Sequence, residues 1–410
     1  MTRSALDQEP ACSDSTGTEE TAHPLGTGAP ARALRVRQTA LADVSRATWD
    51  GLAATTPWAT PFSSWGFQRA WWDAYGLSAH EQTLLIEDEA GVPVAIAPLM
   101  HRHEVEPTDA ETHTRMRQEG AAELTPIAPT AKAIFFGASY HADYATILAA
   151  PDDLADVADA VVAHLAARAA PDDAHPAPWD VVDLRRLRCG DPAGDALAAA
   201  FGRREIDEGW RLNVEREDVC PVLTLALGTD FETYLGTLGK KERHEVRRKI
   251  RRAEAVGEIR LTESPDPLAE LESFIDLHQK RWGADGLFAD TPGGDASRVF
   301  FRRMFEENGP DGPIRLSFLS VGDRRIASGI HFRTADGFLY YNAGVDPEAR
   351  ELSPGVLMVA AYVQQAIAEG CRRVDFLRGN EPYKYEWGAV DEPIQRLLVR
   401  RDVAGPAVAG

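Results

Sequence analysis

A serine, a proline and a glycine follow one another at positions 353–355, between an aromatic run and a long apolar helical pattern. Ser353 can cap the free amides of a helix start, and Pro354 suits the first helical position, where a missing N–H costs nothing. The unpaired amides and the positive end of the helix dipole then point at whatever occupies this turn. The pattern therefore predicts an anion site such as a phosphate site, although a capped helix packed on a sheet has the same local signature.

A second group of residues that could take part in binding or catalysis is a run of basic side chains. Residues 240–252 contain eight lysines and arginines, Arg243 and Arg247 among them, and Val246, Ile250 and Ala253 keep an apolar stripe at helical spacing. The run predicts a docked helix with a basic face. That face is either solvated and paired with local acids, or a landing surface for a phosphorylated or otherwise anionic ligand.

Histidines offer little evidence of a metal. His101 and His103 alternate as strand residues do, but no third ligand has suitable spacing. His278 and Trp282 are four apart on an expected helix and therefore share a face. Three indoles, Trp65, Trp71 and Trp72, lie in another expected helix and are interpreted as core.

The second half must position the serine–proline–glycine turn. An expected hairpin, 314–321 and 325–333, turns at Gly322-Asp323 and is joined by an aromatic strand that ends at Asp346-Pro347. Gly370 stops the helix that follows the turn. The other expected elements are strands over 220–227, 338–342, 373–377 and 394–400 and helices over 230–238, 268–282, 297–307, 356–369 and 382–387.

The first half alternates strands with helices, which predicts an α/β domain. A hairpin is expected from 82–86 and 92–100, and the boundary with the second half is expected near 209–217. The other expected elements are strands over 33–38, 133–136, 145–148 and 179–184 and helices over 42–53, 62–75, 152–169 and 195–203.

Composition excludes several classes of protein. The 410 residues carry a formal net charge of −20, which argues against general affinity for nucleic acid or anionic membranes. The four scattered cysteines predict a reducing compartment and no structural zinc. No apolar run approaches a membrane span, and the first thirty or so residues are polar and predict a disordered arm instead of a signal peptide. We therefore expect a cytoplasmic protein.

The order of elements in the second half resembles the acyl-CoA-binding arrangement of the GNAT acetyltransferase fold, and specifically its FemAB-like branch. That branch includes acyltransferases associated with cellulose or envelope-polysaccharide biosynthesis. The match covers most of positions 35–400, strongly in the second half. The residues that carry it are Leu238-Gly-Lys-Lys-Glu-Arg243, Arg247-Arg-Lys249, His278, Arg281-Trp282, Leu352-Ser-Pro-Gly355, Asp375-Phe-Leu-Arg-Gly379, Tyr383-Lys384, Trp387 and, in the first half, Asp143-Tyr144.

The resemblance implies an α/β (α+β) protein with tandem GNAT-like domains, each a mixed, mostly antiparallel sheet flanked by helices. The expected divisions are a disordered arm at 1–32, a first domain at 33–212 with a loop insertion at 102–132, a second, acyltransferase domain at 213–402 and a tail at 403–410. It also implies direct transfer of an acyl group from acetyl-CoA or another acyl-CoA to an amine or hydroxyl, without a metal. The acceptor would be a small molecule or a cell-envelope precursor.

The resemblance also implies roles for single residues. Pyrophosphate would bind the backbone from Ser353 to Val356, through Pro354 and Gly355, and the strand end at Tyr341-Asn342 would polarise the thioester carbonyl. The candidates are Asp375 and Glu381 as base, Tyr383 as acid and Lys384 as a phosphate contact, with His278, Trp282, Arg243, Arg247, Asp143 and Tyr144 on the substrate side.

Each role has a structural competitor. Asp375 can simply fix Lys384 or Arg378, and Tyr383 and Trp387 share a helical face and can be packing residues. Two other functions remain open as well. One is an aminoacyl transferase that uses aminoacyl-tRNA, for which the basic helix would hold RNA phosphates. The other is a non-catalytic protein that keeps the fold as a binding module.

Overall fold

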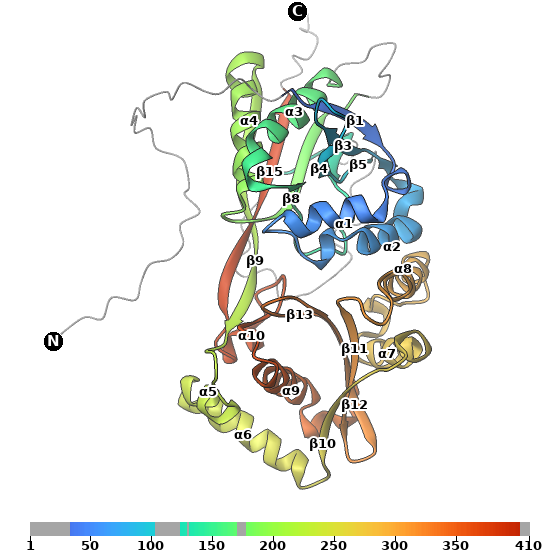
Figure 1. Ribbon diagram of the computed structural model, residues 1–410. Helices are drawn as coiled ribbons and strands as arrows, with labels where there is room; N and C mark the ends of the chain where they lie inside the picture. Colours follow the sequence, from blue (N-terminus) through green and yellow to red (C-terminus); the bar gives the residue numbers. More distant parts are fainter. Residues whose placement is uncertain (1–32, 103–123, 129–130, 170–177, 402–410) are drawn as a thin grey trace, which may run out of the picture.

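The computed structural model describes residues 33–102, 124–128, 131–169 and 178–401. The predicted arm over 1–32, most of the predicted loop over 102–132 and the tail over 403–410 lie outside the described residues. Figure 1 shows the first half at one end of the molecule and the second half at the other. Two long strands, β9 (Trp210–Thr224) and β15 (Val390–Arg401), run side by side from one half to the other.

The first half follows the alternation predicted from its sequence. A short hairpin, β3 with β4, pairs Leu84 with Ala97, as predicted. Trp71 is fully buried in helix α2, whereas Trp65 and Trp72 are half-buried at the edge of the core. The elements are β1 (Arg35–Thr39), α1 (Arg46–Thr55), α2 (Trp65–Tyr75), β2 (His80–Glu81), β3 (Thr83–Glu87), β4 (Pro93–Ala97), β5 (Leu99–Arg102), β6 (Ala133–Phe136), β7 (Leu148–Ala149), α3 (Leu154–Ala167), β8 (Val181–Arg188) and α4 (Pro192–Glu208).

The second half contains every element predicted for it and one strand, β10, that was not predicted. Its antiparallel strands β10 to β13 are followed by helix α9, strand β14 and the short helix α10. The elements are β9 (Trp210–Thr224), α5 (Phe231–Thr237), α6 (Lys240–Glu254), β10 (Ile259–Glu263), α7 (Pro267–Trp282), α8 (Pro292–Asn308), β11 (Ile314–Val321), β12 (Arg324–Arg333), β13 (Gly337–Val345), α9 (Pro354–Ala368), β14 (Arg373–Asp375), α10 (Pro382–Glu386) and β15 (Val390–Arg401).

One sheet of eleven strands runs through both halves, in the order β10-β11-β12-β13-β14-β9-β15-β8-β6-β5-β2. Four further strands form a smaller sheet in the order β1-β3-β4-β7. Most neighbours are antiparallel, and the parallel pairs are β13 with β14 and β6 with β8. The predicted class, a mixed and mostly antiparallel α/β fold, is confirmed.

The two halves exchange strand partners at their junction. The predicted boundary at 209–217 lies inside β9, which is continuous from Trp210 to Thr224. The last strand, β15, pairs with β9 along its whole length and also with β8 of the first half, where Arg400 faces Val181. The end of the chain thus completes the sheet of the first half, because a buried strand must pair on both edges.

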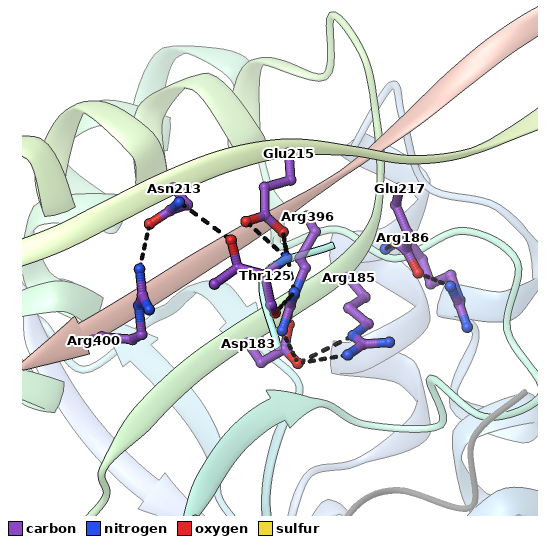
Figure 2. A network of polar contacts seen from close by, with 9 residues as sticks. All are labelled: Thr125, Asp183, Arg185, Arg186, Asn213, Glu215, Glu217, Arg396 and Arg400. Atoms are coloured by element: carbon purple, nitrogen blue, oxygen red, sulfur yellow. Dashed lines mark hydrogen bonds and ion pairs between the residues drawn. The ribbon is translucent and has the colours of Figure 1, made fainter. Parts of the chain in front are cut away.

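A buried ionic network fixes β15 in this position (Figure 2). Arg396, on β15, donates to both carboxylate oxygens of Asp183 on β8, at 2.5 and 3.0 Å. The same guanidinium contacts Glu215 on β9 at 3.1 Å and donates to the carbonyl of Thr125 at 2.8 Å. Arg396 and Asp183 are both fully buried, so each charge needs compensation, to which Glu215 adds for Arg396 and Arg185, at 3.0 Å, adds for Asp183.

Candidate functional site

The candidate site lies where two parallel strands of the second half separate. β13 and β14 pair only from Gly337 opposite Arg373 to Leu339 opposite Asp375, although β13 continues to Val345. On its other edge β13 pairs with β12 and carries one extra residue. His331 faces Tyr340 and its neighbour Ile330 faces Asn342, so one residue of β13 between them has no partner on β12. The extra residue is Tyr341. A bulge of this kind bends the strand and re-aims its backbone groups, and it lies at the predicted position for carbonyl polarisation.

Helix α9 begins beside this separation, and its first turn differs from the prediction in one respect. Ser353 has left-handed backbone angles (φ 58°, ψ 56°), and its side chain does not cap the helix. The hydroxyl instead accepts a hydrogen bond from Arg252 of α6 at 2.9 Å. The predicted serine cap is therefore wrong, and the serine side chain leaves the helix start uncapped.

A cavity of about 310 Å³ opens at this helix start. A Cβ built on Gly355 would meet no atom within 4 Å, so the glycine faces open space. Two arginines, Arg281 from α7 and Arg350, contribute positive charge to the lining, and the one carboxylate, Asp346, pairs with Arg324 at 2.6 Å. The lining consists of Arg281, Val345, Asp346, Pro347, Arg350, Ser353, Pro354, Gly355 and Val356. A helix dipole with two guanidinium groups beside it is suited to a diphosphate.

Asp375 ends strand β14 and is almost completely buried, with 1% of its surface exposed. Its carboxylate accepts from the hydroxyl of Tyr144 at 2.8 Å and from the amide of Leu377 at 2.8 Å, and Arg373 lies 3.4 Å away. Burial raises the pKa of Asp375 to about 6, against the opposing effects of Arg373 and of the Tyr144 hydroxyl.

The loop after Asp375 is held by Lys384. The buried ammonium donates to the carbonyls of Leu377, Arg378 and Gly379 at 2.9–3.1 Å, and it contacts Glu381 at 2.9 Å. Leu377 has a φ of 56°, a conformation that costs a non-glycine residue energy and needs such support. Lys384 has three donors and all three are used, so we reassign it from phosphate binding to support of this loop.

Tyr383 lies at the mouth of the separation and is 37% exposed. Its ring packs against Phe376, which in turn packs against Tyr340 on β13. Burial raises the pKa of Tyr383, and burial raises that of Tyr340 to about 12, while the charge of Arg281 acts to lower both. Arg281 is thus close enough to influence the two tyrosines and also lines the cavity.

Helix α7 lies directly on the separated part of β13. A Cβ on Gly344 would lie only 2.5 Å from the backbone nitrogen of His278, so the two backbones are in contact. His278 is buried among Phe274, Phe288 and Trp282, and burial lowers its pKa to about 4. The structure therefore places this predicted substrate residue in the packing of α7.

The predicted arginines of the basic helix point to local partners. Arg247 pairs with Glu232 at 2.5 Å, and Arg243 donates to the carbonyl of Gly236 at 3.1 Å. The far end of α6 approaches the cavity lining, where Arg252 donates to Ser353. Arg252 is the contact that was not predicted, because its partner lies about one hundred residues away in sequence.

The first half contributes one segment to the site. Asp143 pairs with Arg378 at 3.0 Å, and Tyr144 donates to Asp375. Beside them, His141 contacts Tyr341, and this histidine was not predicted. Its only signal in the sequence is its place two residues before Asp143, in a stretch that contains no regular element.

In the first half, the helix start that corresponds to the start of α9 carries negative side chains, whereas the start of α9 has positive ones beside it. β6 and β8 also pair in parallel for two residues only, and helix α3 precedes β8 as α9 precedes β14. The first turns leading into α3, however, carry Asp152, Asp153 and Asp156. Carboxylates at a helix start repel an anionic ligand, so the start of α3 is not suited to a diphosphate in the way the start of α9 is.

The described part of the chain has neither a metal-binding cluster nor a membrane-spanning helix. No group of three histidine, cysteine, aspartate or glutamate side chains there is arranged to hold a metal ion. No helix among these residues combines the length and apolar content that a membrane span requires.

Comparison with known proteins supports this geometry. Residues 240–385 match the family described as acetyltransferase (GNAT) domain. The crystal structure of FemX aligns with a TM-score of 0.53 at 10% identity, over 86% of this chain and 96% of that one. A conserved protein of unknown function from Bacteroides thetaiotaomicron VPI-5482 aligns with a TM-score of 0.52 at 14% identity, over 90% and 100% of the two chains. No protein of curated function matches the sequence significantly.

The two structural alignments extend over both halves and show a shared fold, while the family match falls on the half that contains the cavity and the strand separation. Residues 240–385, within the second half, therefore match a GNAT acetyltransferase domain, and the fold of the whole chain is shared with FemX.

Proposed function

We propose that the protein is an acyl-CoA-dependent N-acyltransferase. It would transfer an acyl group directly to an amine, or to a hydroxyl, of a small molecule or a cell-envelope or polysaccharide precursor, in the cytoplasm where such precursors are made. The observation that carries this proposal is the cavity at the start of α9. It joins a helix start that its serine side chain does not cap to Arg281 and Arg350, beside the point where β13 and β14 separate.

The donor would bind with its pyrophosphate at Ser353–Val356 and its thioester between the separated strands. Backbone N–H groups at the bulge, near Tyr341 and Asn342, would polarise the thioester carbonyl. Because the acceptor and the thioester are held together in one cleft, much of the rate enhancement would come from positioning. No side-chain nucleophile is required for such a direct attack.

Two protons must move during the transfer. Tyr383 would protonate the leaving thiolate, since this tyrosine is partly exposed at the mouth of the separation. Glu381 and Asp375 are the candidate acceptors of the ammonium proton. Glu381 is paired with Lys384 but keeps a quarter of its side chain exposed, whereas Asp375 is buried and has a pKa near neutrality.

Ligand binding tests the proposal before any acceptor is known. We expect CoA and acetyl-CoA to raise the unfolding temperature, because a ligand at a hundred times its dissociation constant adds about 2.7 kcal/mol to the free energy of unfolding. Gly355→Leu should abolish this effect without unfolding the protein, because its side chain would fill the open cavity. Gly202→Leu, in α4, is the matched control, since a Cβ there also meets nothing within 4 Å.

A different donor would give a different result. The basic face of α6 exposes Lys240, Lys241 and Arg251, which is compatible with an aminoacyl-tRNA donor. That alternative predicts no stabilisation by any CoA thioester and an affinity for tRNA that falls steeply with salt. A non-catalytic binding protein predicts neither effect, and Tyr383→Phe would then change nothing that can be measured.

A further inference from the structure

A short segment of the first half reaches the strand separation of the second half and touches both of its sides. We define this segment as the strut, residues 141–144. It follows a tight turn in which Ala138 has a φ of 60° and accepts the amides of His141 and Ala142 at 3.2 and 3.0 Å. The turn directs the strut away from β6 and toward the second half.

On one side the strut holds β13. The hydroxyl of Tyr341, the extra residue of the bulge, donates to the carbonyl of His141 at 3.0 Å and lies 3.4 Å from its Nδ1. The imidazole is itself fixed, because Tyr75 lies 2.7 Å from its Nε2 and Phe300 stacks on the ring at 4.3 Å. Ser297, on α8, lies 3.0 Å from the Tyr75 hydroxyl.

These contacts select one arrangement of protons. Tyr341 donates to the His141 carbonyl, so its oxygen is free to accept from Nδ1–H. Nε2 then accepts from Tyr75, which accepts from Ser297. The imidazole is neutral in this arrangement, in agreement with the burial and the nearby Arg378 charge that lower the pKa of His141 to about 3.

On the other side the strut holds β14 and the loop that follows it. Tyr144 donates to Asp375 at 2.8 Å, and Asp143 pairs with Arg378 at 3.0 Å. The ring of Tyr144 is covered by the guanidinium of Arg188, 4.9 Å from its centre. Tyr144 is 3% exposed and Asp375 is 1% exposed, so neither can exchange its partner for water without cost.

The strut therefore binds one residue on each side of the gap. Hydrogen bonding between the strands ends at Leu339 and Asp375, and the strut takes over at Asp375 on one strand and at Tyr341, two residues further, on the other. In a sheet of otherwise paired strands, this bridge fixes how far the two strands stand apart.

We propose that the strut sets the separation of β13 and β14 and thereby positions the thioester carbonyl for attack, with His141 and Tyr144 as positioning residues. The inference rests on the proposed function, because the separated strands hold the thioester in that account. It gives the first half, which has acidic residues where the second half has its anion site, a specific part in the transfer. Loss of the strut would slow the transfer step and leave binding of the CoA moiety intact, because the cavity at α9 contains no strut residue.

Tyr144→Phe is the most direct test, because it removes the hydroxyl and keeps the ring. We expect kcat to fall about 10-fold to 100-fold, as small misplacements of reacting groups produce, with unchanged affinity for CoA. Tyr234→Phe is the matched control. It also removes a buried tyrosine hydroxyl bond, at 2.7 Å to the carbonyl of Trp387, but does so away from the gap.

The pH profile of Tyr144→Phe separates positioning from general stability. The Tyr144 hydroxyl favours the ionised form of Asp375, as does Arg373, whereas Glu392 on β15 and burial oppose it. Cys220 on β9 also faces the pair. In Tyr144→Phe the acidic limb of kcat should move to higher pH, an effect that lower stability alone does not produce. Unchanged kcat and an unchanged limb, with stability lowered as in Tyr234→Phe, would overturn the inference.

Amide hydrogen exchange tests the strut without substrate. In Tyr144→Phe and in His141→Phe, the amides of residues 340–343 should exchange faster than in Tyr234→Phe, because one anchor of the gap is lost. If the protein binds no CoA but these amides respond as expected, the proposed function fails and the strut stands. If CoA binds and the amides do not respond, the strut is wrong and the proposed function is retained.

Discussion

The guanidinium of Arg252 donates to the hydroxyl of Ser353 at 2.9 Å, which joins the end of the basic helix α6 to the start of α9. The contact occupies the hydroxyl of Ser353, which has left-handed backbone angles and does not cap its own helix. The contact also distinguishes two groups of basic residues on α6. Arg247 and Arg248 pair with Glu232 and Glu245 on the surface, whereas Arg252 bonds to Ser353, a residue of the cavity lining.

The two arginines that line the cavity should control donor affinity. We expect Arg281→Gln and Arg350→Gln each to weaken CoA binding by about tenfold or more, because each removes charge-assisted hydrogen bonds to phosphate. The slope of affinity against salt should also become shallower. Calorimetric titration at several salt concentrations measures both effects. Arg260→Gln, on β10, where the arginine pairs with Glu258, should bind CoA as the wild type does.

The contact between α7 and β13 requires a glycine at position 344. Gly344→Ala should lower the free energy of unfolding by about 1–3 kcal/mol or more, because its methyl group would meet the backbone of α7 and that backbone cannot rotate away. CoA affinity should fall as well, since the displaced α7 carries Arg281. Urea unfolding measures the first effect. Gly51→Ala in α1, where a Cβ meets nothing within 4 Å, should leave stability unchanged or slightly increased.

The buried network in Figure 2 should contribute strongly to stability. Arg396→Met should cost about 3–5 kcal/mol, because it removes the fully buried partner of Asp183 and leaves that buried carboxylate with only the partly exposed Arg185. Chemical denaturation followed by fluorescence measures the loss. Arg248→Met, which breaks an exposed ion pair with Glu245, should leave the denaturation midpoint unchanged. Equal behaviour of the two variants would contradict the role assigned to Arg396.

The pKa of Asp375 predicts a stability change with an unusual sign for a carboxylate. The folded protein binds this proton more tightly than the unfolded chain, so the stability that Asp375 contributes is present below about pH 3.8 and is lost as the pH rises to about 6. The wild type should lose free energy of unfolding on the order of 3 kcal/mol through this group as the pH rises across that range, and Asp375→Asn should not show this loss. The test is the difference between wild type and variant in urea unfolding at each pH, with Asp323→Asn, in the turn between β11 and β12, as the control. A difference independent of pH would show that the carboxyl titrates as it does in the unfolded chain.

Sequence patterns predicted the helix of the candidate anion site and its flanking strands because the signals are local. A proline at the first position of a helix and a glycine behind it act within one turn, and apolar periodicity marks the strands. The conformation of Ser353 could not be predicted in this way. The Ser353 hydroxyl bonds to Arg252, and a contact across about one hundred residues leaves no local pattern.

The same limit applies to the first half of the site. Asp143 and Tyr144 were expected to contact substrate, whereas in the structure they contact Arg378 and Asp375. His141 was not identified, because its partner Tyr341 lies 200 residues away. Strand exchange by β15 was also beyond prediction, since the amphipathic pattern of a strand does not specify which neighbours it pairs with.

Tyr383 is the proposed acid, and a neighbouring tyrosine allows a well-matched test. Tyr383 and Tyr385 lie on the same short helix and are both 37% exposed, but the Tyr385 hydroxyl donates to Asp391 at 2.7 Å on the surface. Tyr383→Phe should lower kcat about 100-fold or more without changing CoA affinity, because a positioned general acid contributes about that much. Tyr385→Phe should retain full activity. A thioester with a more acidic leaving thiol should restore much of the lost rate in Tyr383→Phe, since a better leaving group has less need of a proton. If the two variants respond alike, the thiolate takes its proton from solvent and Tyr383 is a packing residue.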